Sequence, residues 1–153
     1  MTELNQSSAI KVSLTLCLAS IVFGVILYLI EYIVGSEISG NSVLSTIMPA
    51  MLTGMYFGSK QGLYLPSKTR WAALALWIAA SFVYAAVVFY YYDFSLADLS
   101  AMINELGWFS LIILVVLVLA FLASYAAFKF GEKTGIKSFL QKKAKADSLA
   151  SKP

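Results

Sequence analysis

Few side chains in this sequence have the chemistry that catalysis or metal binding requires. The chain has no His and a single Cys, Cys17, so the usual zinc and haem ligand sets cannot be assembled and no disulfide can form within it. Serine and threonine supply only hydroxyls, and a hydroxyl without a neighbouring base is not an activated nucleophile. We therefore expect no catalytic residue, no metal ligand and no cofactor, and we expect that the protein is not an enzyme.

The ionisable residue closest to the interior of an apolar segment is Glu31. Acidic groups inside membrane helices commonly serve ion coupling or ligand binding. Counted from Val12, however, Glu31 is the twentieth residue, which places it about 28 Å along a helix, at the level of the lipid headgroups. We interpret Glu31 as a solvated carboxylate at the membrane interface, with a coupling or ligand-binding acid as the alternative.

Two other groups of residues resemble functional sites but are better explained by packing and solvation. Met48, Met51 and Met55 form a soft apolar stripe that suits core packing, because no Cys or His accompanies it. Asp98 and Glu105 belong to one polar segment and are interpreted as its solvated face, since no third polar partner completes a catalytic set.

Four long segments without charged residues make up most of the chain. They cover residues 12–30, 38–59, 71–92 and 106–128, and each can cross an apolar layer of about 30 Å as a helix. With 60% hydrophobic and 12% charged residues, a soluble fold would have to expose large apolar patches. The composition predicts an all-α integral membrane protein, an antiparallel bundle of four transmembrane helices with spans of about 12–32, 42–59, 71–92 and 107–128.

The charged residues divide between the two ends of these predicted helices. All eleven Lys and Arg lie in 1–11, in 60–70 or after residue 128. Together with three acids they give these segments a net charge of +8, whereas the opposite ends carry the other five acids. The positive-inside rule then places both termini in the cytoplasm. We expect a cytoplasmic N-terminus over 1–11, a single transmembrane domain over 12–130 and a basic cytoplasmic tail over 131–153, disordered from residue 146.

Lipid is the partner that this charge distribution indicates. The tail alternates apolar and basic residues in an interfacial pattern, and we expect it to contact lipid headgroups through Lys137, Lys142, Lys143 and Lys145. Attraction to an anionic leaflet explains the basic segments without a nucleic acid as partner. On the opposite side, residues 93–105 are predicted to form one short surface helix, capped by Ser95.

The second segment is the least apolar of the four, and we expect it to need neighbouring helices to stay in the membrane. Pro49 lies inside it, removes a backbone donor and predicts a kink. After it, small residues recur at every fourth position, at Ala50, Gly54, Gly58 and Gly62. Such a stripe lets another backbone approach closely. It serves either packing against the first or third span or docking of another chain, and Gly62 could instead serve the following turn.

The third and fourth charge-free segments differ in the size of their side chains. The third is rich in alanine, and the fourth is bulky over 111–122 but small again over 123–127. The helices are therefore expected to pack most closely toward the cytoplasm. A cleaved signal peptide is the alternative for the first segment, but its apolar run is long and no A-x-A-like site follows.

Gly54, Phe57 and Gly58, followed by a basic turn with Pro66 and Arg70 and a new apolar run, resemble the junction of spans two and three in a family of small four-span bacterial inner-membrane proteins. The resemblance covers residues 54–70, the overall length and the number of spans. The acidic residue associated with the start of the third span in that family is replaced here by uncharged neighbours. The resemblance implies the topology and a bacterial inner membrane, and it implies no activity or site.

Three classes of function remain. The leading hypothesis is a non-enzymatic interaction protein, either an accessory subunit or an immunity-type protein that intercepts a toxin within the bilayer. Its partner would be another membrane protein or a second copy in a homo-oligomer. The alternative is a small oligomeric transporter or channel-like protein for a small solute. An intramembrane enzyme is disfavoured, because it would need a nucleophile with a base or a set of metal ligands.

Overall fold

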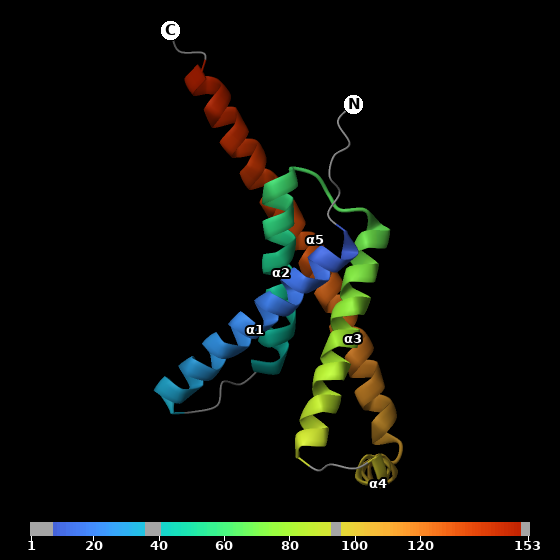
Figure 1. The fold of residues 1–153 in the computed structure, drawn as a ribbon. Helices are drawn as coiled ribbons and strands as arrows, with labels where there is room; N and C mark the ends of the chain where they lie inside the picture. The colour runs from blue at the N-terminus through green and yellow to red at the C-terminus, as the bar shows by residue number, and fades with distance from the viewer. Residues whose placement is uncertain (1–7, 36–40, 93–95, 151–153) are drawn as a thin grey trace.

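The computed structural model describes residues 8–35, 41–92 and 96–150, and no strand occurs among them. Five helices follow one another in the order α1 (Ala9–Val34), α2 (Asn41–Gln61), α3 (Ser67–Tyr91), α4 (Leu96–Leu106) and α5 (Phe109–Ala150) (Figure 1). Three segments are long and apolar enough to cross a membrane, namely Ala9–Val34, Ser67–Tyr91 and Phe109–Leu149. The prediction of an all-α, membrane-embedded protein is confirmed. Helix α2, at the position of the predicted second span, is not one of the three, which agrees with its low apolar content.

A serine cap, two glycines and a proline mark where the first three helices begin or end. The Ser8 hydroxyl accepts a hydrogen bond from the Lys11 N–H at 3.4 Å and caps α1, satisfying one of the free donors of the first turn. Gly35 and Gly62 follow α1 and α2 with φ of 70° and 66°, in the left-handed region where glycine carries no steric penalty. Pro66 precedes α3, where its fixed φ suits the start of a helix.

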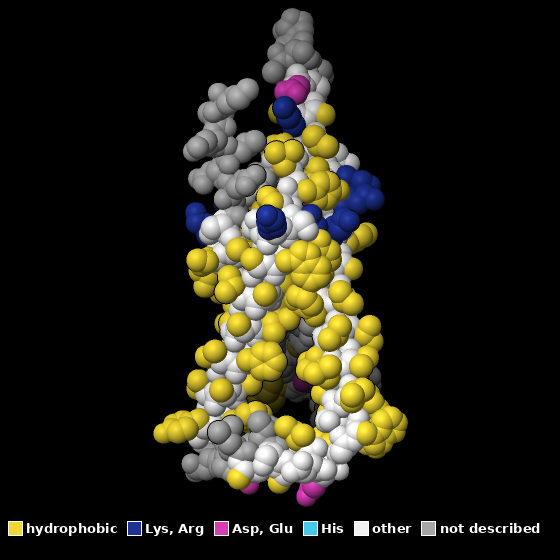
Figure 2. Space-filling model, turned by 90° about the vertical axis from the view of Figure 1, so that its right-hand side faces the viewer, with side chains coloured by type: hydrophobic (Ala, Val, Ile, Leu, Met, Phe, Trp, Pro, Cys, Tyr) yellow, Lys and Arg dark blue, Asp and Glu magenta, His cyan; other side chains and the backbone are white. Residues whose placement is uncertain are grey.

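Both described ends of the chain lie at the same end of the structure. Figure 1 shows the start of α1, the turn between α2 and α3, and the C-terminal half of α5 at the top, and α4 at the bottom. Helix α2 crosses α5 in the most extensive helix contact of the described residues, while α1 packs on α2 and α3. We call the two ends basic and acidic, because Lys and Arg gather near the first of them (Figure 2).

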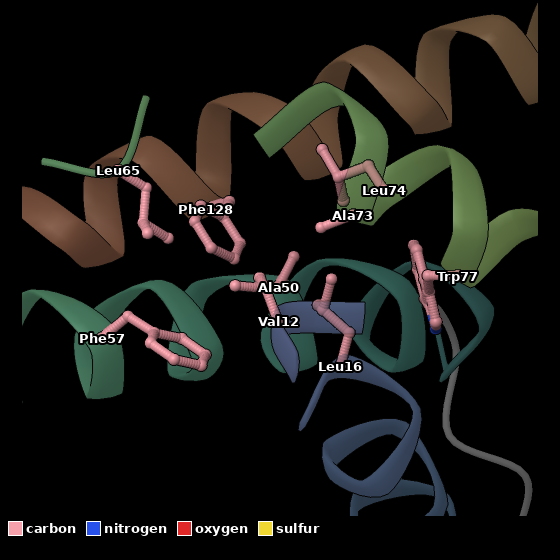
Figure 3. Packing of buried hydrophobic residues seen from close by; sticks show 9 residues of the cluster. All are labelled: Val12, Leu16, Ala50, Phe57, Leu65, Ala73, Leu74, Trp77 and Phe128. Carbon is pink, nitrogen blue, oxygen red and sulfur yellow. The ribbon is translucent and has the colours of Figure 1, made fainter. Parts of the chain in front are cut away.

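The buried apolar side chains form one cluster near the basic end. Nine residues belong to it: Val12, Leu16, Ala50, Phe57, Leu65, Ala73, Leu74, Trp77 and Phe128. In Figure 3 the Phe128 ring of α5 points toward Ala50 of α2, and Val12 and Leu16 of α1 lie on the other side of Ala50. Buried Leu27 of α1 is the exception, lying nearer the acidic end. The prediction that the helices pack most closely at their basic ends is confirmed.

Helix α5 is much longer than the sequence suggests. It was expected to leave the bundle near residue 128 and to give way to a tail disordered from residue 146, but one continuous helix of 42 residues runs to Ala150. At about 1.5 Å per residue it is about 63 Å long, and the end of its C-terminal half projects beyond the other helices (Figure 1). The packing of α5 on α2 also continues past residue 130, because Gly131 and Gly135 lie against the α2 backbone.

The segment after α3 behaves as predicted where the structure describes it. Helix α4 is the expected short helix at the acidic end, with Asp98 in its first turn, where a negative charge is favoured by the helix dipole. The predicted cap, Ser95, lies outside the described residues.

Candidate functional site at the basic end

The tightest contact in the described structure is a crossing of two glycine pairs. Gly54 and Gly58 of α2 lie against the α5 backbone, Gly131 and Gly135 of α5 lie against the α2 backbone, and all four residues are buried. A Cβ atom built at Gly54 would lie 3.1 Å from the Glu132 backbone nitrogen, and one built at Gly135 would lie 2.6 Å from that of Ser59. The two backbones are therefore in direct contact, and neither helix can carry a side chain here.

The predicted small-residue stripe thus packs on a partner that the sequence did not indicate. The first and third spans were the expected neighbours, but the residues facing Gly54 and Gly58 come from α5. On α1, by contrast, a Cβ atom built at Gly24 would have nothing within 4 Å. At the ends of the stripe, Ala50 belongs to the core cluster and Gly62 turns the chain beside the Phe139 ring. Pro49 is buried within α2, which continues as a helix on both sides of it.

A buried carboxylate fastens the turn between α2 and α3 to this crossing. Glu132 of α5 is 0% exposed, and its Oε1 accepts a hydrogen bond from the Leu65 N–H at 2.9 Å. Its Oε2 lies 3.5 Å from Nε of Arg70, which is 8% exposed. The guanidinium donates in turn to the Leu65 carbonyl, from Nε at 3.2 Å and from its second terminal nitrogen at 3.1 Å. Leu65, Arg70 and Glu132 therefore form a closed ring of contacts, which we call the Glu132 clasp.

Aromatic and hydroxyl groups surround the guanidinium on its α5 side. The Arg70 guanidinium carbon lies 5.6 Å from the centroid of the Tyr125 ring, within the range of a cation–π interaction. Trp71 stacks on Tyr125 with 4.4 Å between ring centroids and packs against Phe121 at 5.3 Å. The hydroxyls of Ser67 and Tyr125 are 3.5 Å apart. The first turns of α3 and the middle of α5 are thus joined by polar and stacking contacts around one buried charge pair.

Burial of the Glu132 clasp costs solvation energy, so its stability depends on the geometry of its contacts. Removing two charges from water costs several kcal/mol per ion, and the pair offsets this only when hydrogen bonds satisfy its remaining atoms. Glu132 Oε2 has the Arg70 charge opposite it but no hydrogen-bond partner, and the buried Thr53 hydroxyl has none either. Loss of either charged partner would leave the other buried and uncompensated, so the clasp is sensitive to substitution at both positions.

The clasp has the chemistry of a latch between elements. Its carboxylate is paired with a guanidinium, and the nearby Ser67 and Tyr125 hydroxyls have no base beside them that could activate a nucleophile. Within residues 8–35, 41–92 and 96–150 no group of three or more His, Cys, Asp or Glu is placed to hold a metal ion. The arrangement can therefore hold α3, α5 and the turn before α3 in one position.

The other residues singled out from the sequence lie away from the clasp. Glu31 is half-buried near the end of α1, and Asp98 and Glu105 are exposed on α4. Cys17 is half-buried and packs against the core cluster. The residues expected to contact lipid headgroups are all exposed on the C-terminal half of α5: Lys137, Lys142, Lys143 and Lys145.

Sequence reasoning missed Glu132, Gly131 and Gly135 as parts of the packed domain. In the sequence Glu132 is one of the three acids of the basic segments, and its neighbours Lys129 and Lys133 give no indication that it is buried. A signal was present in the glycine spacing. Gly131 and Gly135 are four residues apart, as Gly54 and Gly58 are, and such paired stripes are typical of close helix crossings.

Comparison of the chain with protein-family models, with curated proteins and with solved structures returns no match. The resemblance to small four-span inner-membrane proteins therefore stays a prediction. The fold and the site define the class, an all-α membrane-embedded protein with a buried ionic latch at its basic end.

Proposed function

We propose that the chain is a four-span protein of the bacterial inner membrane with both termini in the cytoplasm. Helix α2 has 21 residues, about 31 Å in length, which matches the apolar thickness of a bilayer. It lies between the levels of the basic and acidic ends, as α1 and α3 do (Figure 1). With α2 as the fourth span, the two termini and the basic turn share one side of the membrane, as the positive-inside rule requires.

Within this topology we propose a non-enzymatic role in binding another membrane protein, as an accessory subunit or an immunity-type protein. The observation that carries this proposal is the exposure of the helices toward the acidic end. Every residue of 111–119 in α5 is exposed. Two and a half turns of α5 therefore present their whole circumference to lipid or to another helix, and helices in lipid associate through such surfaces by close packing.

The face that would dock a partner is not the small-residue stripe on α2. The α2 stripe is occupied by α5, so it is not free for another chain. Helix α3 offers a second small-residue face, because Ala75, Ala79 and Ala86 are exposed and lie near one another around the helix. Their small side chains would let a foreign helix approach the α3 backbone closely.

Site-specific photo-crosslinking in cells tests this function. A benzophenone amino acid placed at Ala79 or Leu114, both exposed, should form an adduct with another membrane protein. The same probe at Lys145, exposed on the projecting half of α5, is the control and should give no such adduct. Absence of protein adducts from both Ala79 and Leu114 would contradict the proposal.

The alternative function, an oligomeric transporter for a small solute, is favoured by one observation. Ionisable residues within membrane helices commonly mark ion and proton pathways, and Arg70 and Glu132 form a buried pair between α3 and α5. Adducts between two copies of the chain at Leu114, without adducts to other proteins, would favour this alternative over the interaction role.

A further inference from the structure

Helices α3 and α5 are joined at both ends but separated between them. At the basic end, Trp71 and Arg70 of α3 contact Tyr125 and Glu132 of α5. At the acidic end α4, which connects the two helices, contacts α5. Between these points α3 and α5 make few contacts. These helices face the viewer in Figure 2, which shows a hollow between them, and we call it the α3–α5 opening.

Apolar side chains border this opening, and charged ones gather at its basic end. Yellow side chains follow both columns of Figure 2, and Lys and Arg lie above the hollow, beyond a band of hydrophobic side chains. Large apolar side chains in this part of α3 and α5 are exposed, among them Phe82, Val83, Leu114 and Val118. Because α3 and α5 make few contacts among the described residues, lipid chains have access to the opening from the bilayer.

Two lysines stand above the aromatic stack that closes the basic end of the opening. Lys68 is one turn before Trp71 on α3, and Lys129 is one turn after Tyr125 on α5. Residues three or four apart share a helix face, and the Trp71 and Tyr125 rings are stacked on each other. Both lysines are exposed. Two lysines on different helices are therefore one turn farther toward the basic end than the stack.

We propose that one anionic phospholipid binds here, with its phosphate between Lys68 and Lys129 and an acyl chain in the α3–α5 opening. The chain would pass over the Trp71 ring, which is 39% exposed. An acyl chain reaches about half of the apolar thickness, roughly 15 Å, which equals about ten helical residues below Trp71. Tryptophan and tyrosine with lysine at the membrane interface are the groups that meet lipid headgroups.

The charge at the two ends of the opening fixes the orientation of this lipid. Asp98 and Glu105 are exposed on α4 at the acidic end, where an anionic headgroup would be repelled. At the basic end the lipid would neutralise Lys68 of α3 and Lys129 of α5, which belong to the two helices joined by the aromatic stack. A lipid bound in this way fills the space between α3 and α5 and differs from the general attraction of the lysine-rich tail to a charged surface. The test of this lipid site uses the purified protein and does not require the proposed protein partner.

Native mass spectrometry of the full-length protein in neutral detergent tests the proposal. Phosphatidylglycerol should form a one-to-one adduct at lower concentration than phosphatidylcholine with the same acyl chains. Each lysine contributes about 1 kcal/mol to attraction of an anionic lipid surface, so Lys68→Gln with Lys129→Gln should weaken the phosphatidylglycerol adduct about 30-fold. The matched control, Lys142→Gln with Lys143→Gln, removes the same charge from the projecting half of α5 and should leave the adduct unchanged.

A second measurement tests where the acyl chain lies. In a variant that keeps Trp71 but carries Trp77→Phe and Trp108→Phe, phosphatidylglycerol brominated on its acyl chain should quench tryptophan fluorescence saturably. Inorganic phosphate should not reverse the quenching, because the acyl chain is needed for binding. The proposal is overturned if the two lipids bind equally, if the control pair weakens the adduct as much as the Lys68 and Lys129 pair, or if phosphate alone displaces the lipid.

Discussion

Replacing Glu132 by Ala should destabilise the protein more than most single changes. The substitution leaves the Arg70 guanidinium, 8% exposed, without its ionic partner, and the Leu65 N–H without its acceptor. Breaking a buried ion pair by removing one partner costs about 3 to 5 kcal/mol. For a chain of this size that corresponds to a fall of roughly 6 to 20 °C in the melting temperature.

Two further variants separate the charge from the hydrogen bond. Glu132→Gln keeps a carbonyl oxygen that can accept from the Leu65 N–H, so it should destabilise less than Glu132→Ala. When Glu132→Gln is combined with Arg70→Gln, the loss should be at least about 1 kcal/mol smaller than the sum of the two single losses, because the pair is removed as a unit. Glu105→Ala, on exposed α4, is the control and should stay within about 0.5 kcal/mol of the parent.

Thermal unfolding of the purified protein, followed by circular dichroism in one detergent for all variants, measures these effects. Folding of each variant is checked beforehand from its helical signal and elution volume. If Glu132→Ala melted within about 2 °C of the parent protein, the buried pair would not fasten the turn to α5, and the clasp would be refuted.

The remaining predictions concern the glycine crossing, the topology and Glu31. Gly58→Leu should destabilise the protein by about 3 kcal/mol in the same unfolding assay, at the upper end of the usual cost of overpacking, because its side chain would meet the α5 backbone. Gly24→Leu, with open space around it, should change little, and equal stability of both variants would argue against the crossing. In a cysteine-free background, a Cys at Ser100 should react with an impermeant thiol reagent in intact cells and one at Ser138 should not, and the reverse result would invert the proposed topology. Glu31→Gln should preserve the phenotype that the gene confers; its complete loss at normal expression would favour the transporter hypothesis.

Much of the secondary structure could be predicted from local sequence. Long runs without charge can be stable in lipid only as helices, because every backbone polar group must then be satisfied within the segment. The three longest apolar helices follow from this rule and from turn residues such as Gly35 and Pro66. The separation of basic from acidic residues likewise lies in the sequence alone, and it indicates which helix ends belong together.

The length of α5 could not be read from apolar runs. The lysines after residue 128 end the hydrophobic segment, but they are good helix formers and no proline interrupts them before Ala150. The change from apolar to lysine-rich sequence after residue 128 therefore marks a change in the surroundings of α5 and not the end of the helix. The expected tail is the second half of that helix, and its first turns belong to the packed domain.

The sequence by itself determined the membrane class, the helices and the existence of a small-residue stripe on α2. Only the tertiary structure decided which helix that stripe meets and which acid is buried. The contact between Leu65 and Glu132 joins residues 67 positions apart, and no local pattern specifies such a pairing. Glu132 has two lysines as near neighbours in sequence and looks solvated, but the close approach of α2 and α5 at their glycines excludes water from it. Because glycine has no side chain, the backbones of α2 and α5 can approach closely, and this approach buries the Glu132 carboxylate.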